Sequence, residues 1–211
     1  MAESANPWNG IFTERGRVFL DVHEDVARLG TRLMDLRAKR VLDLGSGTGR
    51  HLVHFARLGF SVSGLDDSLE GTRLAGQWLA SEGLDADVRV GSMHDPLPYP
   101  DAFFDAVIAV QVIHHARLAA IRGLVAEMTR VLNPRGLVFV TVPAFRNQAS
   151  AFDEIEPGTF LPLDGPEKGL PHHYFSVEEL RVLFEAFDVD DVHVDGVGHF
   201  CLSGVKRPAN S

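Results

Sequence analysis

Apolar residues recur along the chain with two different periods, and the change from one to the other predicts where helices and strands lie. Steps of three and four residues, the period of one helix face, predict helices over 18–37, 52–58, 69–81, 118–132 and 177–187. Short apolar runs predict strands over 41–44, 61–65, 88–90, 105–111, 136–142, 189–194 and 199–205. This alternation predicts an α/β fold, a doubly wound and mostly parallel sheet with helices on both faces.

The C-terminal part of the chain departs from this alternation. Residues 143–175 hold five of the 11 prolines and no sustained period, which is typical of a lid or a binding loop without regular structure. The last two strands follow each other closely and predict an antiparallel hairpin at the sheet edge. We expect one domain with four parts, which are a helical cap (1–40), a core (41–142), a lid (143–175) and a C-terminal helix with strands (176–211).

Composition narrows the class of protein. The 20 basic and 29 acidic residues give a net charge of −9, which disfavours nucleic acid as a partner. Cys201 is the single cysteine, so a disulfide framework and a zinc site of several thiolates are excluded. The sequence shows neither a signal-peptide pattern nor a run of about 18 apolar residues. We expect a cytoplasmic protein without membrane contact, monomeric or homodimeric.

The segment VLDLGSGTGRH at 41–51 carries the strongest chemical signal. A strand enters a turn with glycines at 45, 47 and 49, and a helix leaves it. Free N–H groups and the positive helix end favour an anionic group, and glycine lets a ligand approach the backbone. Asp66 ends the next strand, 17 residues after Gly49, where a carboxylate accepts from ribose hydroxyls. The pattern predicts a nucleoside-bearing ligand, and tight packing of strand and helix is the alternative interpretation.

Asp43 helps to choose among nucleoside ligands. The glycine spacing G-x-G-x-G differs from the dinucleotide pattern G-x-G-x-x-G, because Arg50 stands where the third glycine would be. An acid in the preceding strand repels a pyrophosphate but attracts an ammonium group. This favours S-adenosylmethionine and leaves an NAD-dependent oxidoreductase as the last alternative.

Four ordered segments carry a resemblance to a known family. They are VLDLGSGTGRH, GLDDS at 64–68, LPYPDAFFDAVIAVQVIHHA at 97–116 and EMTRVLNPRGLVFVTV at 127–142. Together they resemble class I S-adenosylmethionine-dependent methyltransferases, specifically the small type 11 kind related to quinone-biosynthesis enzymes. The resemblance implies a single Rossmann-like domain with a cofactor-binding core at 41–142, S-adenosylmethionine as cofactor and S-adenosylhomocysteine as product.

The resemblance also assigns the cofactor contacts. The expected contacts are Asp43, Gly45, Ser46, Gly47, Gly49, Asp66, Asp67, Ser92, Met93 and Gln111. Many relatives have an acid for the adenine amino group at the position of Ser92. Ser92 is expected to form a weaker hydrogen bond there while Met93 covers the adenine, and Asp95 from a shifted loop is the alternative. Gln111 is expected beside the methionine part of the ligand.

Histidines supply the candidate catalytic groups. His114 and His115 follow a strand at the carboxyl edge of the sheet, where α/β folds bind ligands, and the resemblance commonly places a histidine at the second position. Methyl transfer requires alignment and exclusion of water, and it requires a base only when the acceptor is protonated. We take His115 and His173 as catalytic candidates, and His172 is an alternative base. A structural role for the histidines after the strand, with the ring donating to a backbone carbonyl, is the other interpretation.

The ten histidines also raise the question of a metal. No H-E-x-x-H or similar ligand spacing is present, and the two His-His pairs meet only if the tertiary fold brings them together. The sequence therefore predicts no metal site.

The sequence favours a small-molecule methyl acceptor. Its pocket is expected between the N-terminal helix and the 143–175 segment, with Arg146 pairing an anionic group. Its aromatic candidates are Trp8, Phe12, Phe19, Phe145, Phe152, Phe160, Tyr174 and Phe175. Two alternatives remain. The stretch AVQVIHHARLAAIRGLVAEMTRVLNPRG is similar to wobble-uridine tRNA carboxymethyl methyltransferases, although the net charge opposes tRNA. A catalytically idle S-adenosylmethionine-binding partner protein is the other.

Overall fold

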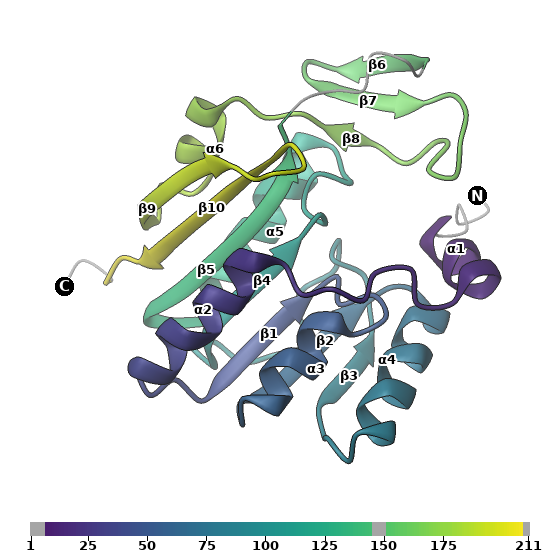
Figure 1. Cartoon of the computed structure of the whole chain (residues 1–211). Helices are drawn as coiled ribbons and strands as arrows, with labels where there is room; N and C mark the ends of the chain where they lie inside the picture. Colours follow the sequence, from purple (N-terminus) through teal and green to yellow (C-terminus); the bar gives the residue numbers. More distant parts are fainter. Residues whose placement is uncertain (1–6, 145–150, 209–211) are drawn as a thin grey trace. The chain divides into compact units, whose positions relative to one another are not determined.

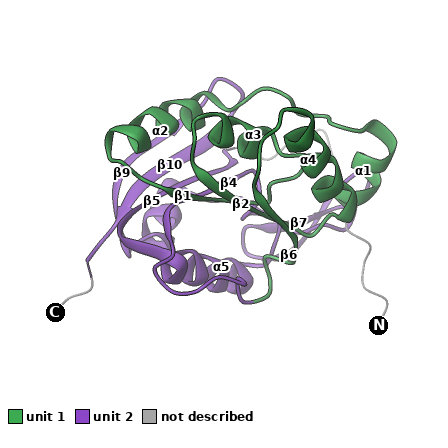
Figure 2. Ribbon diagram, turned by 90° about the horizontal axis from the view of Figure 1, so that it is seen from below, with its two compact units in different colours: residues 1–95 green, residues 96–211 purple. Residues whose placement is uncertain are grey.

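The computed structural model describes residues 7–144 and 151–208, and the chain divides into two compact units. Residues 1–95 form the first unit and residues 96–211 the second, coloured green and purple in Figure 2. Within the described residues, no helix combines the length and the apolar character needed to cross a membrane.

The first unit alternates strands and helices after two N-terminal helices (Figure 1). Its elements are α1 (Pro7–Arg15), α2 (Glu24–Asp35), β1 (Arg40–Leu44), α3 (Arg50–Arg57), β2 (Ser61–Asp66), α4 (Leu69–Ser81) and β3 (Asp87–Val90). The strands lie in the order β3-β2-β1, and both pairs are parallel. In this register Asp43 lies opposite Gly64. Consecutive strands joined by helices therefore give the predicted parallel arrangement.

The core of the first unit follows from continuous apolar runs. Val41, Leu42 and Leu44 are buried on both sides of β1, as expected for a strand of a parallel sheet with helices over its faces. Helix α3 buries Leu52 and Phe55 beside it. This packing holds β1 in place and thereby positions the glycine-containing residues 45–49 that follow it.

The predicted helix over 18–37 is wrong in its first part. Helix α2 begins only at Glu24, because the His23 side chain accepts a hydrogen bond from the Asp25 N–H and caps the helix there. A separate helix, α1, ends before Gly16, whose φ of 65° breaks the helical path. Phe19, one of the expected aromatic residues of the acceptor pocket, lies in the segment between the two helices and is 48% exposed.

The second unit contains four strands of an extended sheet. Its main elements are β4 (Phe104–Val110), α5 (Leu118–Val131), β5 (Leu132–Pro143), α6 (Val177–Leu183), β9 (Phe187–Val194) and β10 (His199–Lys206). The strands lie in the order β4-β5-β10-β9, with β4 parallel to β5 and both later pairs antiparallel. The parallel pairs in both units and the antiparallel hairpin at the C-terminal edge confirm the predicted Rossmann-like α/β class.

Part of the predicted irregular segment has regular structure. Strands β6 (Phe152–Glu156), β7 (Thr159–Pro162) and β8 (His172–His173) form a separate antiparallel sheet in the order β6-β7-β8 (Figure 1). The prediction missed it because prolines dominate the segment and its strands are short. Gly158, with φ of 77°, allows the tight turn between β6 and β7.

Candidate functional site

The glycine turn, residues 45–49 between β1 and α3, has the backbone that its composition requires. Gly45, Gly47 and Gly49 have φ values of 68°, 51° and 92°, in the left-handed region that favours glycine. The N–H groups of Gly45 and Ser46 both donate to the Leu65 carbonyl, at 2.7 and 3.2 Å. The Gly49 N–H donates to the Ser46 carbonyl at 2.9 Å. These N–H groups are therefore occupied within the protein, which differs from the expectation of free donors for an anion.

Two of the glycines also allow close packing. A Cβ at Gly47 would lie 3.4 Å from Cζ of Phe12, and one at Gly49 would lie 2.8 Å from Cβ of Ala75 on α4. Phe12 belongs to α1, so this helix packs directly on the glycine turn. Both glycines are therefore explained by tight packing, which was the alternative interpretation of the motif. The evidence for a bound nucleoside then comes from the acidic residues Asp43 and Asp66.

Asp66 is held at the end of β2 by two backbone donors. Its Oδ2 accepts from the Gly47 N–H at 2.7 Å and its Oδ1 from the Ser68 N–H at 2.8 Å. Burial raises the pKa of Asp66 to about 6, while these two hydrogen bonds act in the opposite direction. The carboxylate is thus ionised at neutral pH, and its remaining lone pairs can accept from hydroxyl groups.

Asp43 lies on β1 directly before the glycine turn and is 1% exposed. Among the described residues, its Oδ2 and the buried Ser46 hydroxyl have no hydrogen-bond partner. Burial raises the pKa of Asp43 to about 8, and the Arg50 charge opposes this shift. A buried carboxyl group with an unsatisfied oxygen fits a ligand that brings a cationic donor, such as the ammonium group of S-adenosylmethionine.

His51 is a neighbour of this site that the sequence reasoning did not assign to it. Its Nδ1 lies 4.0 Å from Oδ1 of Asp43, and its Nε2 accepts from the His23 N–H at 3.4 Å. Burial and the Arg50 charge hold the pKa of His51 well below its usual value, so the ring is neutral. The only sequence signal for it is its place directly after the glycine motif.

The predicted adenine loop follows β3 in the same unit. The Gly91 N–H donates to the Asp66 carbonyl at 3.0 Å, so this loop begins beside the ribose candidate. The Ser92 hydroxyl accepts from the His94 N–H at 3.1 Å and closes a turn that contains Met93. Burial raises the pKa of the neighbouring Asp67. The first unit therefore contains every predicted cofactor residue except Gln111.

Gln111 lies in the second unit, directly after β4, and its backbone is unusual. Its φ is 59°, in the left-handed region that a non-glycine residue rarely adopts. The backbone N–H of Gln111 donates to both the carbonyl and the hydroxyl of Thr141, and its side-chain amide donates to the same hydroxyl at 3.0 Å. Such strain persists where surrounding contacts fix it, and it is common at functional sites.

The candidate catalytic histidines also lie in the second unit. His115 is 9% exposed, and burial, together with the charge of His172, lowers its pKa to about 3. His173 on β8 is fully buried, and its Nδ1 lies 2.7 Å from the Thr159 hydroxyl. The His173 N–H donates to the His114 carbonyl at 2.8 Å, which joins β8 to the turn after β4. Their catalytic roles remain predictions.

The acceptor-pocket candidates are only partly visible. Phe145 and Arg146 lie outside the described residues. In the second unit, Phe160 of β7 contacts Phe152 and Tyr174, with ring centroids 6.4 and 5.9 Å apart. These rings pack against one another at the sheet formed by β6, β7 and β8, and Phe12 packs on the glycine turn. These aromatic residues therefore have packing partners within the protein.

Comparisons with known proteins agree with this arrangement. A family model described as a methyltransferase domain matches residues 42–140. A ubiquinone biosynthesis O-methyltransferase of Caulobacter vibrioides is 32% identical over 164 residues, which are 78% of this chain and 64% of that protein. The chain thus spans slightly less than two thirds of that relative's length.

Solved structures share the fold. A S-adenosylmethionine-dependent methyltransferase of Methanosarcina mazei superposes with a TM-score of 0.67 at 25% identity, covering 80% of this chain and 92% of the other. The 1,6-didemethyltoxoflavin-N1-methyltransferase of Burkholderia thailandensis, solved with bound 1,6-didemethyltoxoflavin and S-adenosylhomocysteine, superposes with a TM-score of 0.66 at 19% identity, covering 96% of this chain and 88% of the other. The second likeness supports the fold alone.

Proposed function

We propose that the chain, which matches a methyltransferase-domain family over residues 42–140 and resembles type 11 class I S-adenosylmethionine-dependent methyltransferases, methylates a small organic molecule. The observation that carries the proposal is the pair of acids at the ends of β1 and β2. Asp43 is buried with an unsatisfied oxygen, and Asp66 is oriented by the N–H groups of Gly47 and Ser68. The pair suits a ligand with an ammonium group and a ribose.

The residues of the first unit would hold the cofactor by charge and hydrogen bonding. When bound, S-adenosylmethionine would supply a methyl group on a cationic sulfonium, and an acceptor atom would bond to the methyl carbon in line while the sulfur leaves as the neutral thioether of S-adenosylhomocysteine. Asp66 would accept from the ribose hydroxyls, and Asp43 would pair with the ammonium group once it is ionised. The turn at Ser92 and Met93 would lie against the adenine. These contacts align the donor, and alignment is the main requirement of this displacement.

We assign no proton transfer to His115 or His173 in this proposal. A general base works best with a pKa near the operating pH, and burial lowers the pKa of His115 far below that range. His173 is fully buried against Thr159. The reaction would then suit an acceptor whose reacting atom already has an available lone pair at neutral pH.

The charge of the chain favours a small acceptor over tRNA. A net charge of −9 gives no general attraction for a phosphate backbone. The matched relative of Caulobacter vibrioides acts, by its name, in the biosynthesis of ubiquinone, which is a small molecule. Both points support a metabolite as the acceptor class.

A transfer assay with labelled donor tests the proposal. The purified chain is incubated with methyl-labelled S-adenosylmethionine and a cell-metabolite fraction in one reaction, and with the labelled donor and a tRNA fraction in another. The Asp66→Asn variant is assayed in the same two reactions, and binding of S-adenosylhomocysteine is measured by calorimetry. Label in the metabolite fraction that depends on Asp66 supports the proposal. Label in tRNA alone replaces it with the tRNA activity, and binding of S-adenosylhomocysteine without any transfer replaces it with an idle binding protein.

A further inference from the structure

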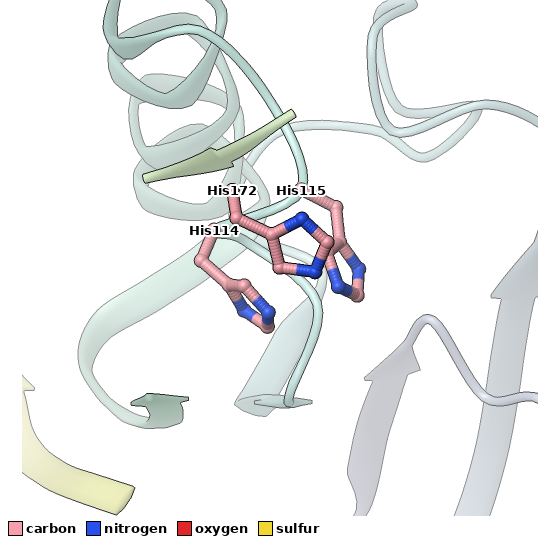
Figure 3. Close-up of side chains that lie close together, drawn as sticks. All are labelled: His114, His115 and His172. Carbon is pink, nitrogen blue, oxygen red and sulfur yellow. The ribbon is translucent and has the colours of Figure 1, made fainter. Parts of the chain in front are cut away.

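Three imidazoles and one carboxylate converge in the second unit, in an arrangement that the methyl-transfer proposal does not use. His114 and His115 come from the turn after β4, His172 from β8, and Glu167 from the segment between β7 and β8. Figure 3 shows the three histidine side chains grouped together, with His172 beside the other two. We propose that this set, the histidine cluster, binds one divalent transition-metal ion of the zinc class.

The donor atoms are already close to one another. One ring nitrogen from each histidine lies within 4.8 Å of those of the other two. Nitrogen ligands of a tetrahedral zinc ion are about 3.3 Å apart, so small side-chain rotations would complete the site. Glu167 reaches two of the rings, with Oε1 3.6 Å from Nε2 of His115 and Oε2 3.2 Å from Nε2 of His172. Glu167 thus lies beside two of the three rings, and it would be the fourth ligand if its side chain also approached the donor nitrogen of His114.

His114 provides an independent sign of a missing partner. The residue is 2% exposed, and its Nδ1 has no hydrogen-bond partner among the described residues. An unsatisfied buried nitrogen destabilises the folded protein, so native proteins rarely contain one.

Contacts with neighbouring groups orient the His172 ring. Its Nδ1 lies 2.8 Å from the Leu170 carbonyl and its Nε2 lies 3.2 Å from Oε2 of Glu167, and both of these oxygens can only accept. An ion bound at Nε2 would take the place of a proton between this ring and Glu167, while Nδ1 keeps its contact with the carbonyl. The hydrogen bond from the His173 N–H to the His114 carbonyl holds β8 against the turn after β4. The backbone thus fixes both sources of ligands.

The ligand types select the class of ion. Three imidazoles and one carboxylate suit zinc and its neighbours, whereas magnesium and calcium prefer oxygen ligands throughout. The sequence alone predicts no metal, since its two His-His pairs have no ligand spacing. The tertiary fold joins one residue of the second pair to both residues of the first. The ion would connect the turn after β4 to β8, so it would also stabilise the second unit.

Titration of the chelator-treated full chain with Co²⁺ and with Zn²⁺ tests this site. We expect binding of about one equivalent, Co²⁺ absorption bands of tetrahedral coordination, and a higher melting temperature with Zn²⁺. His172→Gln should weaken binding by about tenfold or more, and so should Glu167→Gln, a partly exposed position at which folding is not at risk. Circular dichroism would verify that both variants fold.

His94→Gln is the control, because the exposed His94 belongs to no group of possible metal ligands among the described residues. Its binding should equal that of the unchanged chain. The proposal is overturned if no stoichiometric binding occurs, or if His94→Gln abolishes binding while His172→Gln and Glu167→Gln do not. The readout is metal binding, so its failure would leave the methyl-transfer proposal untouched, and the reverse also holds.

Discussion

The glycine turn and the histidine cluster differ in how the chain assembles them. The glycine turn and its two acids come from consecutive strands, β1 and β2, whose parallel register places Leu44 opposite Leu65. The histidine cluster joins the turn after β4 to β8, which belongs to a different sheet. The first site is thus a consequence of local sequence plus one strand pairing, whereas the second exists only once two sheets of the second unit are in place.

The same physical cause prepares both sites for a cation. Burial raises the pKa of Asp43 to about 8 and lowers that of His115 to about 3, because in each case it disfavours the charged form. Both groups are therefore largely neutral near pH 7 in the protein alone. A bound ammonium group would favour the ionised form of Asp43, and a metal ion would bind the neutral form of His115.

The largest expected effect tests whether the glycine turn is also a packing device. Gly49→Ala should lower the free energy of unfolding by about 2–4 kcal/mol, since its Cβ would lie 2.8 Å from Cβ of Ala75 and its φ is 92°. Gly59→Ala is the control, because its φ is 85° but no atom lies within 4 Å. It should cost only about 1–2 kcal/mol. Equal losses in urea unfolding would contradict the packing role.

The next effect tests Asp66 as the ribose ligand. Asp66→Asn removes a charged acceptor, so the affinity for S-adenosylhomocysteine should fall by about 10- to 100-fold in calorimetry. Asp87→Asn, the same substitution on the exposed start of β3, should leave the affinity unchanged. Unchanged affinity in Asp66→Asn would remove this residue from the site.

A smaller effect tests whether the small sheet of the second unit acts through stability alone. Thr159→Val removes the hydroxyl at 2.7 Å from Nδ1 of His173, and we expect a loss of about 1–2 kcal/mol in the free energy of unfolding. Thr13→Val, whose hydroxyl donates to the Asn9 carbonyl on the exposed side of α1, should change it by less than about 0.5 kcal/mol. S-adenosylhomocysteine affinity should stay constant in both, and its loss in Thr159→Val would connect this sheet to the cofactor.

The smallest effect tests the ammonium contact of Asp43 through pH. The ammonium group binds the ionised carboxylate, and the pKa of Asp43 in the protein alone is about 8. The affinity for S-adenosylhomocysteine should therefore rise by about fivefold from about pH 7 to pH 8. Asp66, with a pKa of about 6, is already ionised over this range. Asp43→Asn should remove the slope, and a flat profile in the unchanged chain would exclude the contact.

Prediction from sequence succeeded where the signal is periodic and local. The helix expected over 69–81 is α4, and the expected edge hairpin is formed by β9 and β10. It failed where tertiary contacts decide the boundary. Helix α1 lacks a clear apolar period and owes its position to the packing of Phe12 on Gly47, and the strands β6–β8 are too short to stand out among prolines.

The sequence by itself determined the alternating fold, the glycine turn and the acids at the ends of the first two strands. These features depend on residue period, on backbone freedom at glycine and on position relative to a strand end, which are all local properties. Only the tertiary structure decided which backbone N–H groups of the glycine turn form hydrogen bonds within the protein and how far burial shifts the pKa of Asp43. It also decided that His172 lies close to His114 and His115. Those outcomes depend on contacts and burial between segments distant in sequence, and no local pattern encodes them.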